Sequence, residues 1–254
     1  MNFNALHHQH APLLIANVWD ASSALAAQDA GYLALGTSSA AIASMLGYDD
    51  GEAISFEELF FIVTRIRAVT MLPLSVDLEA GYSETTRGVI ENIQRLATLG
   101  VVGINLEDSR VIRGERYAEA VSTFALKLKD VRDACPDMFL NIRTDAFLLN
   151  HAQALDETLR RGQCYQAHGA DGFFVPGVTQ DEDIKTLVRE VGLPLNVMCM
   201  PDLADFDALA ASGVRRISMG NFVHSAIQTQ LKDLLFTIQN AQSFAGVFSH
   251  ESHR

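Results

Sequence analysis

The sequence is poor in cysteine and in positive charge, and each shortage excludes a class of protein. Its three cysteines, Cys135, Cys164 and Cys199, are an odd number and form no Cys-x-x-Cys or Cys/His ligand pattern, which argues against a disulfide framework or a structural zinc site. Lysine and arginine total 19 against 31 aspartates and glutamates, for a formal net charge of −12. Nucleic acids and anionic membranes bind proteins with positively charged surfaces, so we expect neither as a partner of this negatively charged chain.

The sequence also shows no pattern typical of a signal peptide or of a membrane-spanning segment. No run approaches the roughly 20 apolar residues that span a bilayer, and the N-terminal residues show no basic stretch followed by an apolar one. We therefore expect a cytoplasmic protein. There is no Pro/Gly/Ser-rich linker, and a length of about 250 residues suits one α/β barrel. We predict a single domain over residues 1–254.

Eight short apolar runs alternate with stretches of helical periodicity. This alternation predicts parallel strands joined by right-handed crossovers, and eight such units close a barrel. An open doubly wound sheet would need a glycine-rich turn after the first strand, where this chain has Asn17-Val18-Trp19-Asp20. We therefore predict an α/β protein with a (β/α)8 TIM barrel. The expected strands are Leu13–Asn17, Tyr32–Thr37, Leu74–Glu79, Val102–Glu107, Phe139–Thr144, Gly172–Pro176, Leu195–Cys199 and Arg216–Gly220. The expected helices are Ala21–Ala30, Ser55–Val69, Thr85–Leu99, Ala118–Ala134, Ala152–His168, Asp181–Val191, Leu203–Ala211 and Val223–Gln242.

Carboxylates close two neighbouring runs, at the strand ends where barrels of this type carry their chemistry. Asp77 and Glu79 are two residues apart, so both should face the same side, and Glu107 ends the next run. Facing the lumen costs less than burial against the helices, so we expect the three to converge. Carboxylates this close need a proton or a cation. Oxygen ligands without histidine or cysteine favour Mg²⁺ or Mn²⁺.

Arg143, at the end of the fifth run, offers a fork of donors that fits a carboxylate. Metal and arginine together would suit a small anionic 2-oxo acid, whose keto and carboxylate oxygens chelate the ion. Other uses remain open. Arg143 could pair with Asp77 or Glu107 as barrel packing, and strand-end carboxylates often cap the following helix. Ser38 and Ser39 could equally be turn residues or sit where the backbone donates to a substrate carboxylate.

At these positions the chain resembles the isocitrate lyase/phosphoenolpyruvate mutase superfamily, from about Asn17 to Asn221. Several motifs in the same order make the resemblance specific. They are Gly36–Ala41, Leu46–Glu52, Val76–Tyr82, Gly103–Asp108 and Asn141–Ala146.

The resemblance implies a barrel with Mg²⁺ and 2-oxo-acid chemistry. Members of the superfamily usually exchange the last helix between subunits, so we expect a homo-oligomer, a dimer or a tetramer, in which 226–242 is exchanged. The strand-end pattern and the resemblance together predict the site residues. These are Arg143, Glu107 and Asp50 for catalysis; Trp19, Ser38, Ser39, Ala40, Asp77 and Arg143 for substrate binding; and Asp77, Glu79 and Glu107 for the metal.

One departure from the superfamily concerns the loop after the fourth strand. Residues 108–117 contain neither the cysteine and histidine of isocitrate-type lyases nor the asparagine of the mutases. Three functions follow from what remains. The first is a Mg²⁺-dependent lyase or decarboxylase that cleaves a C–C bond of a small 2-oxo acid, such as oxaloacetate, through a metal-stabilised enolate. The second is a phosphonopyruvate mutase or hydrolase, and the third a barrel that binds 2-oxo acids without turnover.

Overall fold

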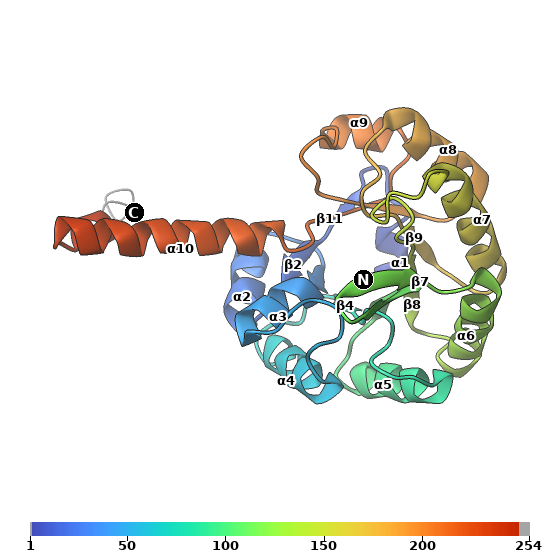
Figure 1. The fold of residues 1–254 in the computed structure, drawn as a ribbon, viewed down its shortest axis with the longest axis horizontal. Helices are drawn as coiled ribbons and strands as arrows, with labels where there is room; N and C mark the ends of the chain where they lie inside the picture. Colours follow the sequence, from blue (N-terminus) through green and yellow to red (C-terminus); the bar gives the residue numbers. More distant parts are fainter. Residues whose placement is uncertain (1, 249–254) are drawn as a thin grey trace.

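A ring of parallel strands forms the centre of the molecule (Figure 1). The computed structural model describes residues 2–248. The first strand is interrupted at Ile15, so that β1 (Leu13–Leu14) pairs with the last strand, β11 (Arg216–Ser218), while β2 (Ala16–Val18) pairs with β3 (Leu35–Thr37). With this first strand counted as one, eight strands of the described part complete the ring, which confirms the predicted (β/α)8 barrel. The others are β4 (Leu74–Asp77), β5 (Gly103–Glu107), β8 (Phe139–Arg143), β9 (Gly172–Phe174) and β10 (Leu195–Met198).

Helices follow the strands and cover the outside of the ring (Figure 1). α4 (Phe56–Arg67) begins as predicted, because Ser55 and Glu58 cap one another through side chain and backbone. α5 (Thr86–Thr98) ends just before Gly100, whose φ of +78° lies in the left-handed region that glycine favours. The rest of the outer layer is α2 (Ala21–Asp29), α6 (Val121–Ala134), α7 (Ala154–Ala167), α8 (Asp181–Val191) and α9 (Phe206–Ala211).

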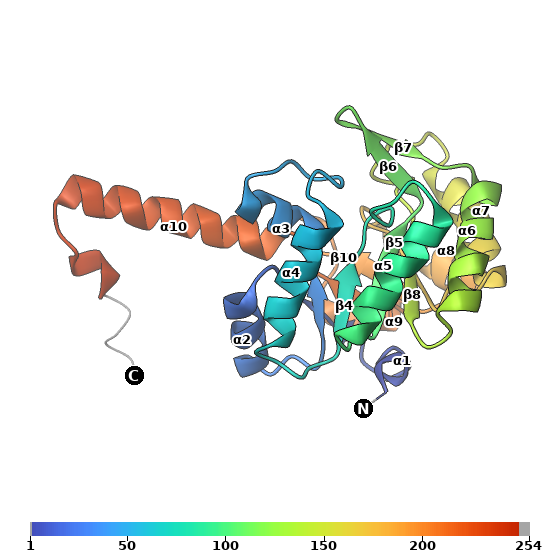
Figure 2. The same cartoon turned by 90° about the horizontal axis from the view of Figure 1, so that it is seen from below.

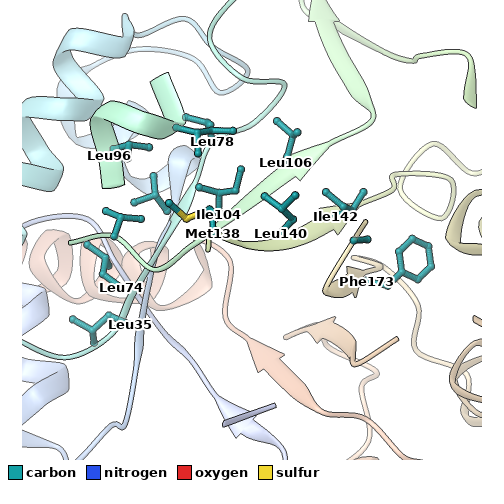
Figure 3. Packing of buried hydrophobic residues seen from close by; sticks show 14 of the residues in the cluster. Leu35, Leu74, Leu78, Leu96, Ile104, Leu106, Met138, Leu140, Ile142 and Phe173 are labelled. Atoms are coloured by element: carbon teal, nitrogen blue, oxygen red, sulfur yellow. The ribbon is translucent and has the colours of Figure 1, made fainter. Parts of the chain in front are cut away.

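The larger part of the apolar core fills the space between the barrel and its helices. Leu74, Ile104 and Leu140 come from neighbouring strands, and Leu96 of α5 lies in the same cluster (Figure 3). All four are fully buried, and burying one such side chain stabilises the fold by about 1.5–3 kcal/mol. Since side chains alternate along a strand, the apolar positions that face the helices leave the intervening positions to the lumen.

The N-terminal segment closes one end of the barrel. α1 (Phe3–Leu6) lies at the end opposite to the hairpin of β6 and β7 described below (Figure 2). The His7 ring stacks on Phe139 with centroids 4.2 Å apart, and His7 Nδ1 lies 3.0 Å from the Phe3 carbonyl oxygen. Burial, and then the charge of Arg216, lower the pKa of His7 to about 3. A small apolar cluster surrounds these rings: Phe3, Leu6, Leu13, Ile15, Ala34 and Phe139.

Polar side chains fill the middle of the lumen. Asn141 Nδ2 donates to Asn105 Oδ1 across 2.8 Å. The fully buried Arg216 of β11 donates from Nη2 to the same oxygen at 3.3 Å and to Ser75 Oγ at 3.4 Å. Ser75, Asn105 and Asn141 each precede a charged strand-end residue by two positions, so the next inward layer is the one where the site is expected.

The main departure from the predicted elements is a two-stranded hairpin over residues 109–118. β6 (Ser109–Ile112) and β7 (Glu115–Ala118) pair antiparallel, where the sequence had suggested a loop running into a helix from Ala118. The turn between them is Arg113-Gly114, with φ of +54° and +81°. Positive φ at both positions matches the twist of a two-residue hairpin, although Arg-Gly is a weaker turn signal than Asn-Gly.

Two smaller differences concern helices. A further helix, α3 (Ser39–Leu46), starts directly after β3, at a place where the sequence had suggested no helix. The predicted helix from Leu203 is shorter and begins at Phe206, capped by Asp205.

The last helix, α10 (Phe222–Ala241), extends away from the barrel (Figures 1 and 2). A short 3-10 turn, Ala245–Val247, follows it. Within residues 2–248 we find no helix with the length and apolar character needed to cross a membrane. The helix nevertheless carries many exposed apolar side chains, namely Phe222, Val223, Ile227, Leu231, Leu234, Leu235 and Phe236.

Candidate active site

Three charged residues end neighbouring strands at the same edge of the barrel. Asp77 is the last residue of β4, Glu107 of β5 and Arg143 of β8. The register pairs Asp77 with Asn105 and Glu107 with Arg143. All three lie two positions beyond the polar residues of the lumen, so they share the inward face, as the sequence predicts for the carboxylates.

Asp77 is held by the start of α3. Its Oδ2 accepts a hydrogen bond from Ser39 Oγ at 2.8 Å and a longer one from the Ser39 N–H at 3.3 Å. Ser38 is the N-cap of α3, and its Oγ accepts from the Ala41 N–H. The two serines therefore have structural uses of their own, and Ala40 lies half-buried in the same first turn. The second oxygen of Asp77, Oδ1, is buried and has no hydrogen-bond partner among residues 2–248.

Glu79 approaches the site by a different route from the one the sequence suggested. β4 ends at Asp77, and Glu79 has a φ of +48°, so strand alternation does not apply to it. Its Oε2 accepts from the Glu52 N–H at 2.8 Å and its Oε1 from the Tyr82 hydroxyl at 2.5 Å. Burial, reinforced by the charges of Asp77 and other nearby carboxylates and only partly offset by the Tyr82 hydrogen bond, raises the pKa of Glu79 to about 8.

Glu107 lies between two arginines. Arg143 Nη1 is 2.9 Å from Glu107 Oε2, and Arg116 of β7 donates from Nη1 to Glu107 Oε1. Burial raises the pKa of Glu107 to about 7, against the opposing effect of Arg143. The same two arginines bind Asp145: Arg143 Nε at 2.6 Å and Arg116 Nη1 at 3.0 Å. These ion pairs outweigh burial, which alone would raise the pKa of Asp145, and hold it below its usual value.

Asp50 lies at the rim of this group. Its side chain is about half exposed, and its Oδ2 is 3.9 Å from Arg116 Nη2. The surrounding protein, followed by the charge of Asp77, raises the pKa of Asp50. The neighbouring Gly51 packs against the hairpin, because a Cβ at that position would come within 2.5 Å of Val111 Cγ2. The loop that carries Asp50 and the hairpin that carries Arg116 are therefore in contact.

Two nearby residues point elsewhere. Trp19 follows β2, is half-buried, and makes an edge contact with His224 of α10 at 4.9 Å between ring centroids. Asp108 faces the helices and not the lumen: its Oδ2 accepts from Arg161 Nη1 at 2.7 Å and from the Tyr165 hydroxyl at 2.6 Å. Asp108 is thus part of the packing between β5 and α7.

Among the predicted metal ligands, Asp77 has the carboxylate oxygen that is best placed to bind Mg²⁺ directly, because that oxygen has neither a hydrogen bond nor an ion pair within the described residues. Among the described residues, no group of three or more His, Cys, Asp or Glu side chains is arranged to hold an ion. Both oxygens of Glu79 accept hydrogen bonds, and Glu107 Oε1 accepts one from Arg116. Glu107 Oε2 accepts no hydrogen bond from the described residues but is ion-paired with Arg143 Nη1 at 2.9 Å. The unpartnered, buried Oδ1 of Asp77 is free to act as a direct ligand. Magnesium usually binds through one or two carboxylates and keeps several waters, so a site with Asp77 as the direct ligand is compatible with these residues.

Sequence comparison assigns the chain to a family. The model of the phosphoenolpyruvate phosphomutase family matches residues 3–238. The chain belongs to this family. An oxaloacetate decarboxylase from Rhodopseudomonas palustris is 31% identical, over 81% of this chain and 73% of its own length.

Solved structures agree on the fold. A protein from Burkholderia cenocepacia J2315, provisionally described as a phosphonomutase, is 38% identical with a TM-score of 0.86, over 92% of this chain and 97% of its own. A phosphonopyruvate hydrolase, solved with oxalate and Mg²⁺, has a TM-score of 0.86 at 19% identity, over 97% of this chain and 88% of its own. The latter likeness concerns the barrel alone.

From the sequence, Arg110, Arg113 and Arg116 are equal candidates to meet an anion at this loop, so Arg116 is not singled out, and the role of Asp145 is underestimated. Asp145 is two residues beyond Arg143, the same spacing as between Asp77 and Glu79, but carboxylates at strand ends often cap the following helix. The sequence does not distinguish Arg116 from the other two loop arginines, because its place depends on the hairpin folding back over the end of β5.

Proposed function

We propose that this family member is a Mg²⁺-dependent carbon–carbon lyase acting on a small 2-oxo acid, with oxaloacetate as the first candidate. The observation that carries the proposal is the meeting of Asp77, Glu107 and Arg143 at the ends of three adjacent strands. An unpartnered carboxylate oxygen and a charged guanidinium are what a metal-chelating oxo acid requires. The similarity to an oxaloacetate decarboxylase supports the same class of reaction.

In this proposal Asp77 holds the metal directly, while Glu79 and Glu107 contribute through water. The ion would supply a positive charge that stabilises the negative charge developing on the keto oxygen as the bond breaks. Ser39 fixes Asp77 through its hydroxyl, so that only Oδ1 is left for binding. The raised pKa of Glu79 shows how strongly its site resists a further negative charge, and a bound cation would relieve that cost.

Arg143 binds a carboxylate of the substrate. Glu107 and Asp145 engage its Nη1 and Nε, which fixes the plane of the guanidinium. Its Nη2 makes no hydrogen bond within the described residues and is available to the ligand. Burial lowers the pKa of Arg143, but the two carboxylates outweigh it, so the group stays charged. We include Ser38, Ser39 and Ala40, at the start of α3, as a second contact for the substrate carboxylate, and Trp19 as a wall of the same site.

Asp50 is our candidate for proton transfer. When oxaloacetate loses CO2, the C3–C4 bond breaks, its electron pair passes toward the keto oxygen, and C3 takes up a proton. The half-exposed Asp50 has a raised pKa and lies at the rim, where it can exchange protons with solvent. With a pKa of about 7, Glu107 is a second group that can hold a proton near neutral pH.

The test starts with binding. Calorimetric titration of oxalate, with and without Mg²⁺, should show binding that needs both the metal and Asp77, and that disappears in Asp77→Asn. A turnover panel follows, with oxaloacetate, substituted malates and phosphonopyruvate. Release of pyruvate and CO2 from oxaloacetate supports the proposal. Release of phosphate from phosphonopyruvate would replace it with carbon–phosphorus chemistry, and binding without any turnover would leave a binding protein.

We also propose that α10 packs against a second copy of the chain. The helix extends from the barrel (Figure 2). Its apolar side chains are exposed, including Leu235 at 57% and Phe236 at 69%. Light scattering after size exclusion should give a dimer or tetramer for the wild type. The double variant Ile227→Glu, Leu231→Glu should give smaller species, whereas Gln230→Glu adds charge at an exposed polar position and should not. A monomeric wild type would contradict the proposal.

A further inference from the structure

Of the three arginines on the β6–β7 hairpin, one points into the site. Arg110 is occupied by Glu119 and Glu84 beside the hairpin, at 2.8 and 3.1 Å. Arg113 is exposed at the turn. Arg116 alone reaches the strand ends, where its side chain is only 18% exposed. The position of Arg116 is therefore set by specific contacts of the folded hairpin, and does not follow merely from the hairpin being rich in arginine.

Contacts on one edge of the Arg116 guanidinium fix its position. Nη1 is within 3.0 Å of Asp145 Oδ2 and 2.9 Å of Ser109 Oγ, and it also donates to Glu107. Ser109 is the first residue of the same hairpin and itself donates to Asp145 at 2.5 Å. These contacts tie the base of the hairpin to the end of β8, so Arg116 is anchored relative to the barrel.

The other edge of Arg116 still has unused donors. Nε makes no hydrogen bond within the described residues, and Nη2 has only the Asp50 carboxylate at 3.9 Å, beyond hydrogen-bonding distance. Arg143 is arranged in the same way, with Nε and Nη1 engaged and Nη2 unengaged. Two guanidinium groups thus share Glu107 and Asp145 as anchors, and each retains a donor edge for a ligand.

We infer that Arg116 binds a second carboxylate of the substrate, and that the substrates of this protein are 2-oxo dicarboxylates. This inference rests on the proposed function. A substrate with a single carboxylate would need only one of the two arginines, and Arg143 already binds that carboxylate in the proposed function. With a monocarboxylic oxo acid, the unengaged donors of Arg116 would face an apolar group and stay unpaired, which weakens binding. The hairpin therefore favours substrates that carry a second carboxylate.

The role predicts a particular kinetic signature. In a decarboxylation, the carboxylate that Arg116 binds is the one that leaves as neutral CO2, so this contact belongs mainly to the bound substrate. Its loss should raise KM and should not lower kcat. Since a hydrogen bond to a charged group contributes roughly a factor of 10 to 100 in binding, KM for oxaloacetate should rise by about that factor.

The experiment compares Arg116→Gln with Arg116→Lys and with Arg113→Gln, which removes the same charge from the exposed turn of the same hairpin. For each we would measure kcat and KM for oxaloacetate. We would also measure inhibition by 4-methyl-2-oxopentanoate, in which an isopropyl group replaces the second carboxylate. Oxalate affinity in the presence of Mg²⁺ reports on the Asp77 and Arg143 part of the site.

The expected result is a KM raised about 10- to 100-fold in Arg116→Gln only, partly restored in Arg116→Lys, with the affinities for oxalate and the isopropyl analogue unchanged or improved. If oxalate affinity and kcat fall together with oxaloacetate binding, Arg116 only supports the site, and the inference is overturned. An effect no larger than that of Arg113→Gln overturns it too. If the wild type turns over no oxo acid, the proposed function has failed. Calorimetric affinities for oxaloacetate and 4-methyl-2-oxopentanoate then still test whether Arg116 binds the second carboxylate.

Discussion

The buried His7 predicts a specific loss of stability in mild acid. In the folded state its pKa is about 3, against 6.5 for the unfolded chain. The unfolded state therefore binds more protons between these values, and stability falls as pH decreases from 6.5 toward 3. At pH 7 both states are mostly neutral, whereas at pH 5 the unfolded His7 is almost fully protonated and the folded one is not. The difference amounts to about 2 kcal/mol between pH 7 and pH 5.

The assay is urea denaturation at both pH values for the wild type and His7→Phe. Phenylalanine keeps the ring stacked on Phe139 but loses the hydrogen bond to Phe3, a cost that should be the same at either pH. Other groups titrate in both proteins and cancel in the comparison. The wild type should therefore lose about 2 kcal/mol more than the variant on going to pH 5. The control His10→Phe alters an exposed ring and should behave as wild type; equal losses in His7→Phe and wild type would refute the reasoning.

Three other perturbations test separate parts of the structure. Arg161→Met would leave the buried Asp108 carboxylate without its ion-pair partner. Urea denaturation should show a free energy of unfolding lower by about 3–5 kcal/mol, while the affinity for oxalate is retained. A loss under about 1 kcal/mol would mean that the pair is not structurally important. Millimolar Mg²⁺ should raise the thermal midpoint of the wild type and not of Asp77→Asn, as followed by scanning fluorimetry, and an equal rise in both would remove Asp77 as the direct ligand. Gly51→Ala places a Cβ within 2.5 Å of Val111 Cγ2 at a φ of +102°. It should lower the free energy of unfolding by about 1–3 kcal/mol and speed proteolysis of the hairpin. Unchanged stability and proteolysis would mean that the packing of Gly51 on the hairpin is unimportant.

The barrel could be predicted from the sequence because its determinants are local. Each buried strand is a short apolar run, and several helices have local start signals, such as the mutual capping of Ser55 and Glu58. The hairpin could not be predicted in this way. Residues 109–118 are rich in charge and lack a strong turn dipeptide, and the strands form because Val111 packs on Gly51 and Arg116 reaches the end of β5.

The part of the site that follows from strand alternation could be predicted from the sequence. Asp77, Glu107 and Arg143 end parallel neighbours, so their convergence follows from the fold. Glu79 lies near them for another reason: the chain leaves the strand at Asp77 and a positive φ turns Glu79 back. The position of Arg116 depends on contacts between segments that are separate in the sequence, so no local pattern distinguishes it from Arg110 and Arg113.

The seam of the barrel has a consequence for how the chain is made. β1 pairs with β11, so Leu13 must meet Arg216. The backbone N–H of Met219 must likewise reach the side chain of Asn17, which lies 202 positions earlier in the sequence. A ribosome delivers the first strand long before its last neighbour exists. Until then the first strand has a free edge of unpaired N–H and C=O groups, which is the kind of surface that captures other chains. Closing the ring is consequently a late event in synthesis, because it requires residues 216–219.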